Sequence, residues 1–181
     1  NCAQLRGLIE EEDKLRQLDT LEQWTRDSHA KLKSLLDKRK SEGYIRECHG
    51  DMHLGNIALV DGEVAIIDGI EFNDFFRWTD VMSEIAFLTM DLDHRGANDL
   101  SNIVLNEYLA QSGDYEGLRL LRFYQVYRAM VRAKVSSFRL AQEGLSEAGQ
   151  EVCFCNIGDA STSEGAFWET VNAAGVIQCP L

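Results

Sequence analysis

The sequence predicts an α+β fold that is mostly helical and contains one small β-hairpin. Apolar residues recur at three- and four-residue spacing through most of the first 145 residues, which is the period of amphipathic helices. Between the helical stretches, two β-rich apolar runs flank Asp61-Gly62-Glu63. Asp-Gly between such runs is typical of a tight hairpin turn.

The helical spacing begins near the start of the chain. We predict helices over residues 5–18 and 21–40, with Asp19 or Thr20 as the amino-terminal cap of the second and Gly43 at its end. Further apolar stripes at helical spacing occur over residues 81–88, 103–109 and 118–140.

The extended segments lie between these helices. Residues 44–48 form a short extended run, and a polar loop continues through Asn56. The two strands of the hairpin are predicted over residues 57–60 and 64–68, so that the second strand ends on Asp68. A polar loop is therefore followed by a hairpin that carries an aspartate at its end.

The composition excludes several classes of protein. A chain of 181 residues with 45% hydrophobic content can form one ordinary domain. It has no apolar run long enough for a bilayer, no signal-peptide pattern at its start, and no paired C-x-x-C spacing among its five cysteines. We expect free thiols, a cytoplasmic location, and no membrane partner.

The net charge of −12 argues against a nucleic-acid partner, because such binding depends on Lys and Arg neutralising phosphates. It suits a cationic small-molecule substrate, although an acidic surface is more often simply a solvated one. The oligomeric state is not predicted.

The polar loop carries the residue types that phosphoryl transfer needs. Asp51 is followed five residues later by Asn56, and Asp68 comes twelve residues after that. Phosphoryl transfer requires a carboxylate to orient the acceptor hydroxyl and oxygen ligands to hold magnesium on the phosphates. The order loop Asp, loop Asn, strand-end Asp is that of a kinase catalytic loop and metal-binding aspartate.

Three segments carry a family resemblance: HGDMHLGN, IIDGIEFND and RWTDVMSEIAFL, within residues 49–88. They resemble the aminoglycoside phosphotransferase family. The resemblance implies that residues 1–145 form the mostly helical carboxy-terminal lobe of a protein-kinase-like fold. It also implies a phosphotransferase that moves the γ-phosphoryl group of ATP, with Mg²⁺, to a hydroxyl group of a small molecule.

By position in these motifs, the resemblance implies roles for five residues. Asp51 resembles the catalytic base, and His49 braces the same loop. Asn56 and Asp68 resemble the magnesium ligands. Asp80 resembles the family's buried aspartate, which ties the catalytic loop in place through hydrogen bonds.

Other acidic and histidine residues nearby have two interpretations. Glu71 and Asp74 could hold substrate cations or could be solvated. His53 is more often a structural hydrogen-bonding residue than a metal ligand. No segment before Tyr44 contains a glycine-rich phosphate loop or a strand lysine, so we expect the amino-terminal lobe to be absent from this chain. The alternative function is a non-catalytic kinase-like binding domain.

The last residues follow a different pattern. Residues 146–150 are predicted as a linker, and residues 151–181 as a short strand and helix. This tail resembles the thiamine-diphosphate-binding segment of 2-oxo acid dehydrogenase decarboxylase components. Asp159 then resembles a metal ligand, and thiamine diphosphate would bind only if that site were complete. We read residues 151–181 as a fragment.

Overall fold

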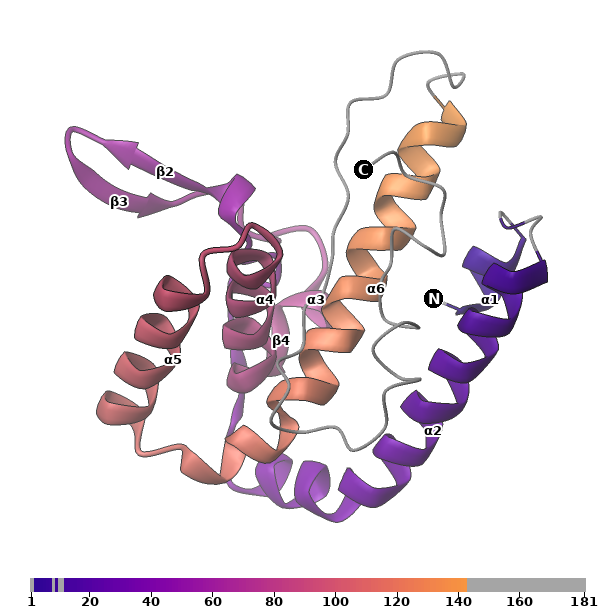
Figure 1. The fold of residues 1–181 in the computed structure, drawn as a ribbon. Coiled ribbons are helices and arrows are strands. Elements are labelled where there is room, and N and C mark those ends of the chain that lie inside the picture. Colours follow the sequence, from indigo (N-terminus) through magenta and orange to yellow (C-terminus); the bar gives the residue numbers. More distant parts are fainter. Residues whose placement is uncertain (1, 8, 10–11, 143–181) are drawn as a thin grey trace.

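The computed structural model describes residues 2–7, 9 and 12–142 (Figure 1). The predicted linker over residues 146–150, the tail over residues 151–181 and its candidate ligand Asp159 lie outside the described residues. So do Cys153 and Cys155, between which we expect no disulfide, because residues two apart on a strand are too far apart for sulfur–sulfur geometry.

The described chain is mostly helical, as predicted. Its principal helices are α1 (Cys2–Arg6), α2 (Glu12–Ser41), α4 (Val81–His94), α5 (Asn98–Ser112) and α6 (Leu118–Gln142). In Figure 1, α4 lies between α5 and α6, and α2 runs along the other side of α6. The chain therefore builds its core around α4.

Helix α4 is central because its sequence is apolar around most of its circumference. Ten of its residues are buried, from Met82 to Leu92. Phe87 and Met90 join the larger core cluster, which also includes Leu18 and Leu21 of α2 and Val126, Ala129 and Met130 of α6. Polar residues on α4, such as Glu84 and Asp91, are thus held in a largely apolar setting.

The predicted break near Asp19 and Thr20 is wrong. One helix, α2, runs through both positions, and the Thr20 hydroxyl donates to the Arg16 carbonyl at 3.0 Å. Because a threonine can satisfy its hydroxyl inside a helix in this way, it does not have to act as a cap. The predicted end is confirmed, since α2 stops at Ser41 and Gly43 follows with a φ of +81°.

The predicted hairpin is confirmed. Strands β2 (Ile57–Val60) and β3 (Glu63–Ile66) pair antiparallel. The two residues between them, Asp61 and Gly62, both have positive φ, at 53° and 86°, as a type I′ turn requires. Strand β3 ends two residues before Asp68.

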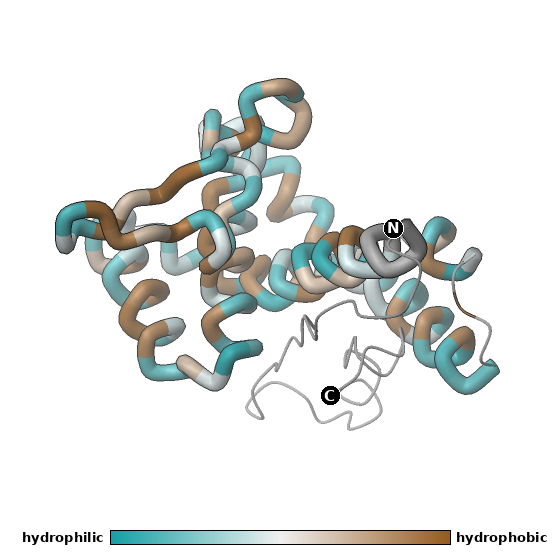
Figure 2. Tube along the Cα trace, turned by 90° about the horizontal axis from the view of Figure 1, so that it is seen from above, coloured by the Kyte–Doolittle hydropathy of each residue, from teal (hydrophilic) through white to brown (hydrophobic). Residues whose placement is uncertain are grey.

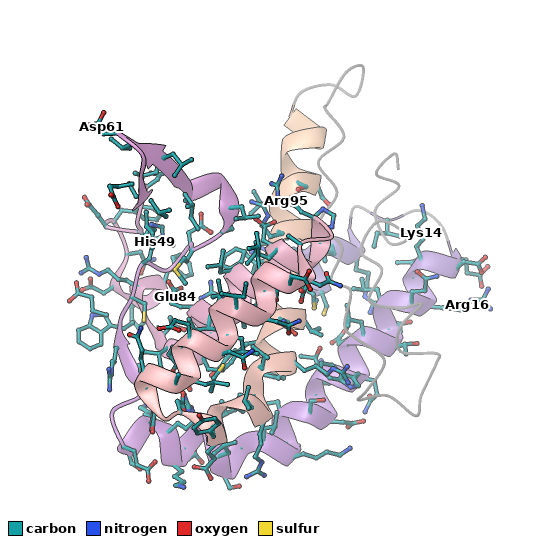
Figure 3. All side chains as sticks on the ribbon, turned by 60° about the vertical axis from the view of Figure 1, so that its left-hand side comes forward. Lys14, Arg16, His49, Asp61, Glu84 and Arg95 are labelled. Carbon is teal, nitrogen blue, oxygen red and sulfur yellow. The ribbon has the colours of Figure 1, made fainter. Side chains whose placement is uncertain are left out.

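The hairpin stands away from the helices (Figures 1 and 2), with Asp61 at its tip (Figure 3). Leu59 and Val64 face each other across it and are 75% and 70% exposed. These hairpin side chains therefore do not pack into the main core.

A second small sheet was not predicted. Strand β1 (Ile45–Glu47) pairs antiparallel with β4 (Trp78–Asp80), so that Ile45 lies opposite Asp80. The four-residue helix α3 (Asp74–Arg77) immediately precedes β4. Within the described ranges, no helix has both the length and the apolar character needed to cross a membrane.

Candidate active site

The loop between β1 and β2 is stabilised by hydrogen bonds between residues that are close together in the sequence. The Asn56 side-chain amide donates to the Asp51 carbonyl oxygen at 3.0 Å and to the Asp51 carboxylate at 3.2 Å. The Gly55 amide donates to Nδ1 of His53 at 3.0 Å, which starts the 3₁₀ turn Leu54–Asn56. Asp51 and Asn56, five residues apart, are thereby brought into contact.

Asp51 is held in its ionised form. A hydrogen bond from His53, whose Nε2 lies 3.4 Å from the carboxylate, is the largest cause of a pKa below the usual value. The Asn56 amide and the charge of Arg132 act in the same direction, and together these outweigh partial burial, which raises the pKa. An ionised, partly exposed carboxylate can accept a hydrogen bond from a hydroxyl group. His53 thus has the structural hydrogen-bonding role expected from the sequence.

His49 joins the loop to the chain that follows the hairpin. Its Nε2 lies 2.8 Å from the Ile67 carbonyl oxygen, and its Nδ1 accepts a hydrogen bond from the Asp51 amide at 3.3 Å. Because a carbonyl only accepts and an amide only donates, the ring proton must be on Nε2. His49 contacts the segment next to Asp68 and the backbone of Asp51.

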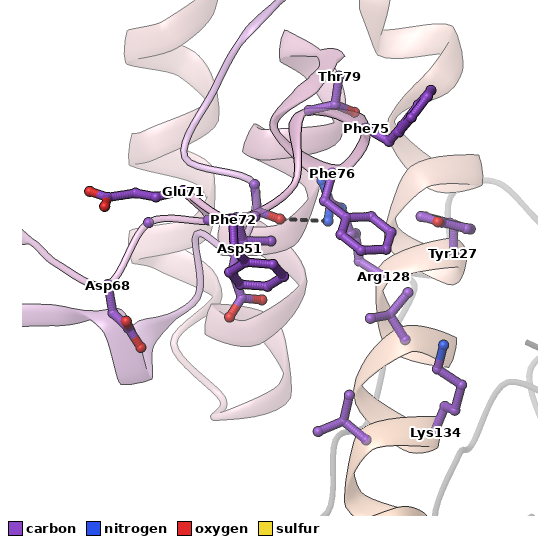
Figure 4. Close-up of a pocket in the computed structure, with 15 residues that line it drawn as sticks. Asp51, Asp68, Glu71, Phe72, Phe75, Phe76, Thr79, Tyr127, Arg128 and Lys134 are labelled. Carbon is purple, nitrogen blue, oxygen red and sulfur yellow. Dashed lines mark hydrogen bonds between the residues drawn. The ribbon is translucent and has the colours of Figure 1, made fainter.

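Asp68 reaches the loop through backbone pairing beyond the end of β3. The Ile67 amide donates to the Asn56 carbonyl at 2.8 Å, and Asp68 follows with a φ of +62°. Asp51 and Asp68 both line one cavity of about 850 Å³ (Figure 4). Asn56 is 8% exposed and is not among the lining residues, so it contacts Asp51 from behind the cavity wall.

The peptide groups of Gly50, just before Asp51, are held by two distant side chains that the sequence did not predict. Its amide donates to Glu84 of α4 at 3.0 Å, and its carbonyl accepts from Arg128 of α6 at 2.9 Å. Glu84 and Arg128 lie 3.3 Å apart with side chains 8% and 9% exposed. A glutamate inside an otherwise apolar helical stretch was the available sequence signal, because such a residue needs a buried partner.

Helix α4 also holds the far end of the loop. Asp91, seven residues or two turns after Glu84, accepts a hydrogen bond from the Leu54 amide at 2.8 Å. One face of α4 therefore binds the loop at both ends.

Asp80 differs from its expected role. It is buried at the start of α4, as expected, and accepts from the Met82 amide at 2.9 Å. It also accepts two hydrogen bonds from Arg39, at 2.8 and 2.7 Å. The loop peptide at Gly50 is held instead by Glu84, one helical turn later. Asp80 is at the cap position, where its carboxylate is used by the helix terminus and by Arg39.

The oxygen atoms near Asp51 are of the kind that Mg²⁺ binds. The Asn56 nitrogen is committed to Asp51, which leaves its oxygen as an acceptor, and Asp68 supplies a carboxylate at the cavity. Among the described residues, no group of three or more His, Cys, Asp or Glu side chains could hold a metal. Oxygen ligands of these types are nevertheless what Mg²⁺ uses when substrate phosphates complete its coordination, so the Asn56 oxygen and the Asp68 carboxylate suit Mg²⁺ in donor type.

Glu71 and Asp74, which had two interpretations from the sequence, lie in different surroundings. Asp74 pairs with Arg77 at 2.6 Å and is 74% exposed, so it belongs to the surface of α3. Glu71 lines the cavity, but its carboxylate points away from the labelled phenylalanines in Figure 4.

Comparisons with known proteins agree with the motifs. A sequence model described as "Phosphotransferase enzyme family" matches residues 2–121. The uncharacterized protein Rv2004c of Mycobacterium tuberculosis (strain ATCC 25618 / H37Rv) and the uncharacterized protein Mb2027c of Mycobacterium bovis (strain ATCC BAA-935 / AF2122/97) are each 43% identical to this chain over 113 residues. Those residues are 62% of this chain and 22% of each relative.

The matched segment is therefore about a fifth of the length of these curated relatives. No solved structure matches the chain significantly. None of the comparisons supports the thiamine-diphosphate resemblance of residues 151–181. The family match covers well over half of the chain, including the whole catalytic-loop region, and the chain accordingly belongs to the phosphotransferase enzyme family.

Proposed function

We propose that this chain carries the catalytic loop of a phosphotransferase that moves the γ-phosphoryl group of ATP to a hydroxyl group of a small molecule. The observation that carries the proposal is that Asp51 and Asp68 line one cavity while Asn56 is hydrogen-bonded to Asp51. Family membership supports the reaction class.

In this mechanism, Asp51 accepts a hydrogen bond from the acceptor hydroxyl and orients its oxygen toward the γ-phosphorus. The hydroxyl oxygen forms the new bond to phosphorus, and the bond from phosphorus to the oxygen bridging the β and γ groups breaks. ADP leaves with that electron pair, and the hydroxyl proton passes to the Asp51 carboxylate.

Asn56 and Asp68 would hold Mg²⁺, which neutralises phosphate charge when bound. His49 supports Asp51 and Asp68, because it hydrogen-bonds to the Asp51 amide and to the Ile67 carbonyl next to Asp68. Glu84 and Arg128 fix the peptide at Gly50, so Asp51 does not have to be ordered when the acceptor binds.

The test compares Asp51→Asn with Asp68→Asn in the full-length protein. We expect Asp51→Asn to lower turnover by about 10²- to 10⁴-fold with little change in Mg²⁺–ATP affinity, because a base acts mainly in the transition state. We expect Asp68→Asn to weaken Mg²⁺–ATP binding as well as turnover. Calorimetry gives the affinity, and ADP release gives the turnover.

Asp74→Asn is the matched control, since Asp74 is an exposed aspartate of the same segment that pairs with Arg77. It should change neither quantity. Equal turnover of the unaltered protein and Asp51→Asn would overturn the proposal. Binding of Mg²⁺–ATP with no transfer to any hydroxyl compound would favour the alternative, a kinase-like binding domain.

A further inference from the structure

The cavity beside Asp51 has one wall of exposed aromatic side chains. Phe72 precedes α3, and Phe75 and Phe76 belong to it; all three line the cavity (Figure 4). They are 84%, 91% and 56% exposed. Phenylalanines exposed together to this degree are typical of a surface that something covers.

A small ligand is the occupant that suits this cavity. Its volume of about 850 Å³ lies within the range of small-molecule sites, which are mostly apolar with a few placed polar groups. Asp51 is one of its lining residues, so a molecule stacked on the phenylalanines would lie in the cavity that contains the proposed base. The cavity can therefore hold the acceptor.

Helix α6 forms the opposite wall. Tyr127, Val131 and Lys134 follow one another at intervals of four and three residues, and all line the cavity, as residues on one helical face do. No carboxylate among the described residues forms an ion pair with Lys134, whereas Arg128 on the same wall is paired with Glu84 at 3.3 Å. Lys134 is thus a cation on this wall that has no ion pair with the described residues.

The acidic groups lie elsewhere in the cavity or have other roles. In Figure 4 the Glu71 carboxylate points away from the phenylalanines and from Lys134. Asp68 is assigned to the metal and Asp51 to the acceptor hydroxyl in the proposed function. Among the described lining residues, Lys134 is therefore the cation without an ion pair, and the carboxylates of Asp51 and Asp68 are those assigned to the hydroxyl group and the metal.

From these walls we infer that the acceptor is a hydroxyl compound with a flat apolar body and one anionic group, which stacks on Phe72, Phe75 and Phe76 and places its anion at Lys134. This inference rests on the proposed function, because it takes the cavity beside Asp51 as the acceptor site. It departs from the cationic substrate that the net charge of −12 suits.

The test uses three probes that share a 4-hydroxyphenyl body: 3-(4-hydroxyphenyl)propanoate, tyramine and 4-ethylphenol. Their affinities for the chain are measured by ligand-observed NMR titration with Mg²⁺ present, because Asp68 is assigned to the metal. We expect the anionic propanoate to bind about five-fold more tightly than the cationic tyramine. A partly exposed ion pair, here between the carboxylate and Lys134, contributes a free energy of that size. The neutral phenol should lie between them.

Two variants assign the preference to the two walls. Lys134→Met keeps the length of the side chain and should remove the preference of the propanoate over tyramine. Phe75→Ala removes a 91% exposed ring and should weaken all three probes by a similar factor. Lys33→Met is the control, because Lys33 is an exposed lysine of α2 that pairs with Asp37; it should change nothing.

The outcomes separate this inference from the proposed reaction. Tyramine binding as tightly as the propanoate, or a preference that survives Lys134→Met, would overturn the acceptor class even if Asp51→Asn abolishes turnover. No saturable binding of any probe would also overturn it. The expected preference without any phosphoryl transfer would keep the anion site and remove the proposed function.

Discussion

Arg39 and Asp80, 41 residues apart in the chain, are joined by two hydrogen bonds of 2.8 and 2.7 Å between side chains that are each 1% exposed. Arg39 makes two further bonds, of 2.6 and 2.8 Å, to Asp114. One guanidinium thus joins the end of α2 to the start of α4 and to the turn before α6.

Replacing Arg39 should be strongly destabilising. Arg39→Met leaves two buried carboxylates without their cation, which costs about 3–5 kcal/mol in comparable buried pairs. Urea unfolding followed by circular dichroism gives the free energy of unfolding. Lys38→Met is the control, because its pair with Glu116 is exposed and should contribute less than about 1 kcal/mol. Similar losses in the two variants would contradict the prediction.

The contribution of Asp114 to stability should decrease in acid. Burial raises the pKa of this carboxyl, but hydrogen bonds from Arg39 and Tyr108 outweigh burial and hold the pKa below its usual value. Such a group stabilises the fold above its unfolded pKa, and the stabilisation is lost as the pH falls through its folded pKa.

The measurement is the free energy of unfolding of the unaltered chain and of Asp114→Asn between about pH 7 and pH 3. Asp114→Asn should be less stable at neutral pH, and the difference should shrink below about pH 4. A difference that stays constant over this range would show that Asp114 does not carry the effect.

Gly50 and Gly62 have nearly the same backbone conformation, with φ of +85° and +86°, but different surroundings. A Cβ on Gly62 meets nothing within 4 Å, whereas one on Gly50 would lie 2.9 Å from the Phe76 carbonyl oxygen. Gly62→Ala should therefore lower the free energy of unfolding only by the cost of placing alanine in the left-handed conformation, about 1–2 kcal/mol.

Gly50→Ala should cost more, by a further ~1–3 kcal/mol, because the backbone must also move. Urea unfolding of the two variants compares them directly. Equal losses would mean that the loop and the segment around Phe76 are not held together as tightly as the structure indicates.

The Cys48 thiol should react slowly with alkylating reagents in the folded chain. Burial, and then the charge of Glu84, raise its pKa to about 11, and its thiol lies 3.8 Å from the Thr79 carbonyl oxygen. Since only the thiolate reacts, a pKa two units higher lowers the rate by about 100-fold. Alkylation by iodoacetamide at about pH 8, mapped to the Cys48 peptide, should be that much slower in the native chain than in urea. Rates within about ten-fold of each other would contradict the raised pKa.

Local features of the fold were predictable from the sequence. Asp61-Gly62 determined the hairpin turn by its own backbone preferences, and the spacing of apolar residues identified α4 and α6. The strand at Trp78 was missed, because three residues carry little propensity signal and the strand exists through pairing with β1, more than 30 residues earlier.

The candidate site was predictable in its composition but not in its support. The motif order predicts Asp51, Asn56 and Asp68 as site residues, and Asp51 and Asp68 line one cavity. What holds the loop was not readable, because Glu84 and Arg128 reach Gly50 from 34 and 78 residues away. Asp80 was assigned to that task, and its partner proved to be Arg39. Partners so distant in sequence are determined by helix packing rather than by local pattern.

The two hydrogen bonds at Gly50 also bear on the order in which the protein folds. A chain emerging from the ribosome exposes its loop and hairpin well before α6 has been made, and domains fold in the course of such synthesis. The carbonyl of Gly50 then has no guanidinium to bind, and Glu84 has no cation beside it. We therefore expect the residues that carry the chemistry to be among the last to reach their final geometry, and a nascent chain that ends before Leu118 to contain the whole Asp51 motif without a fixed Asp51.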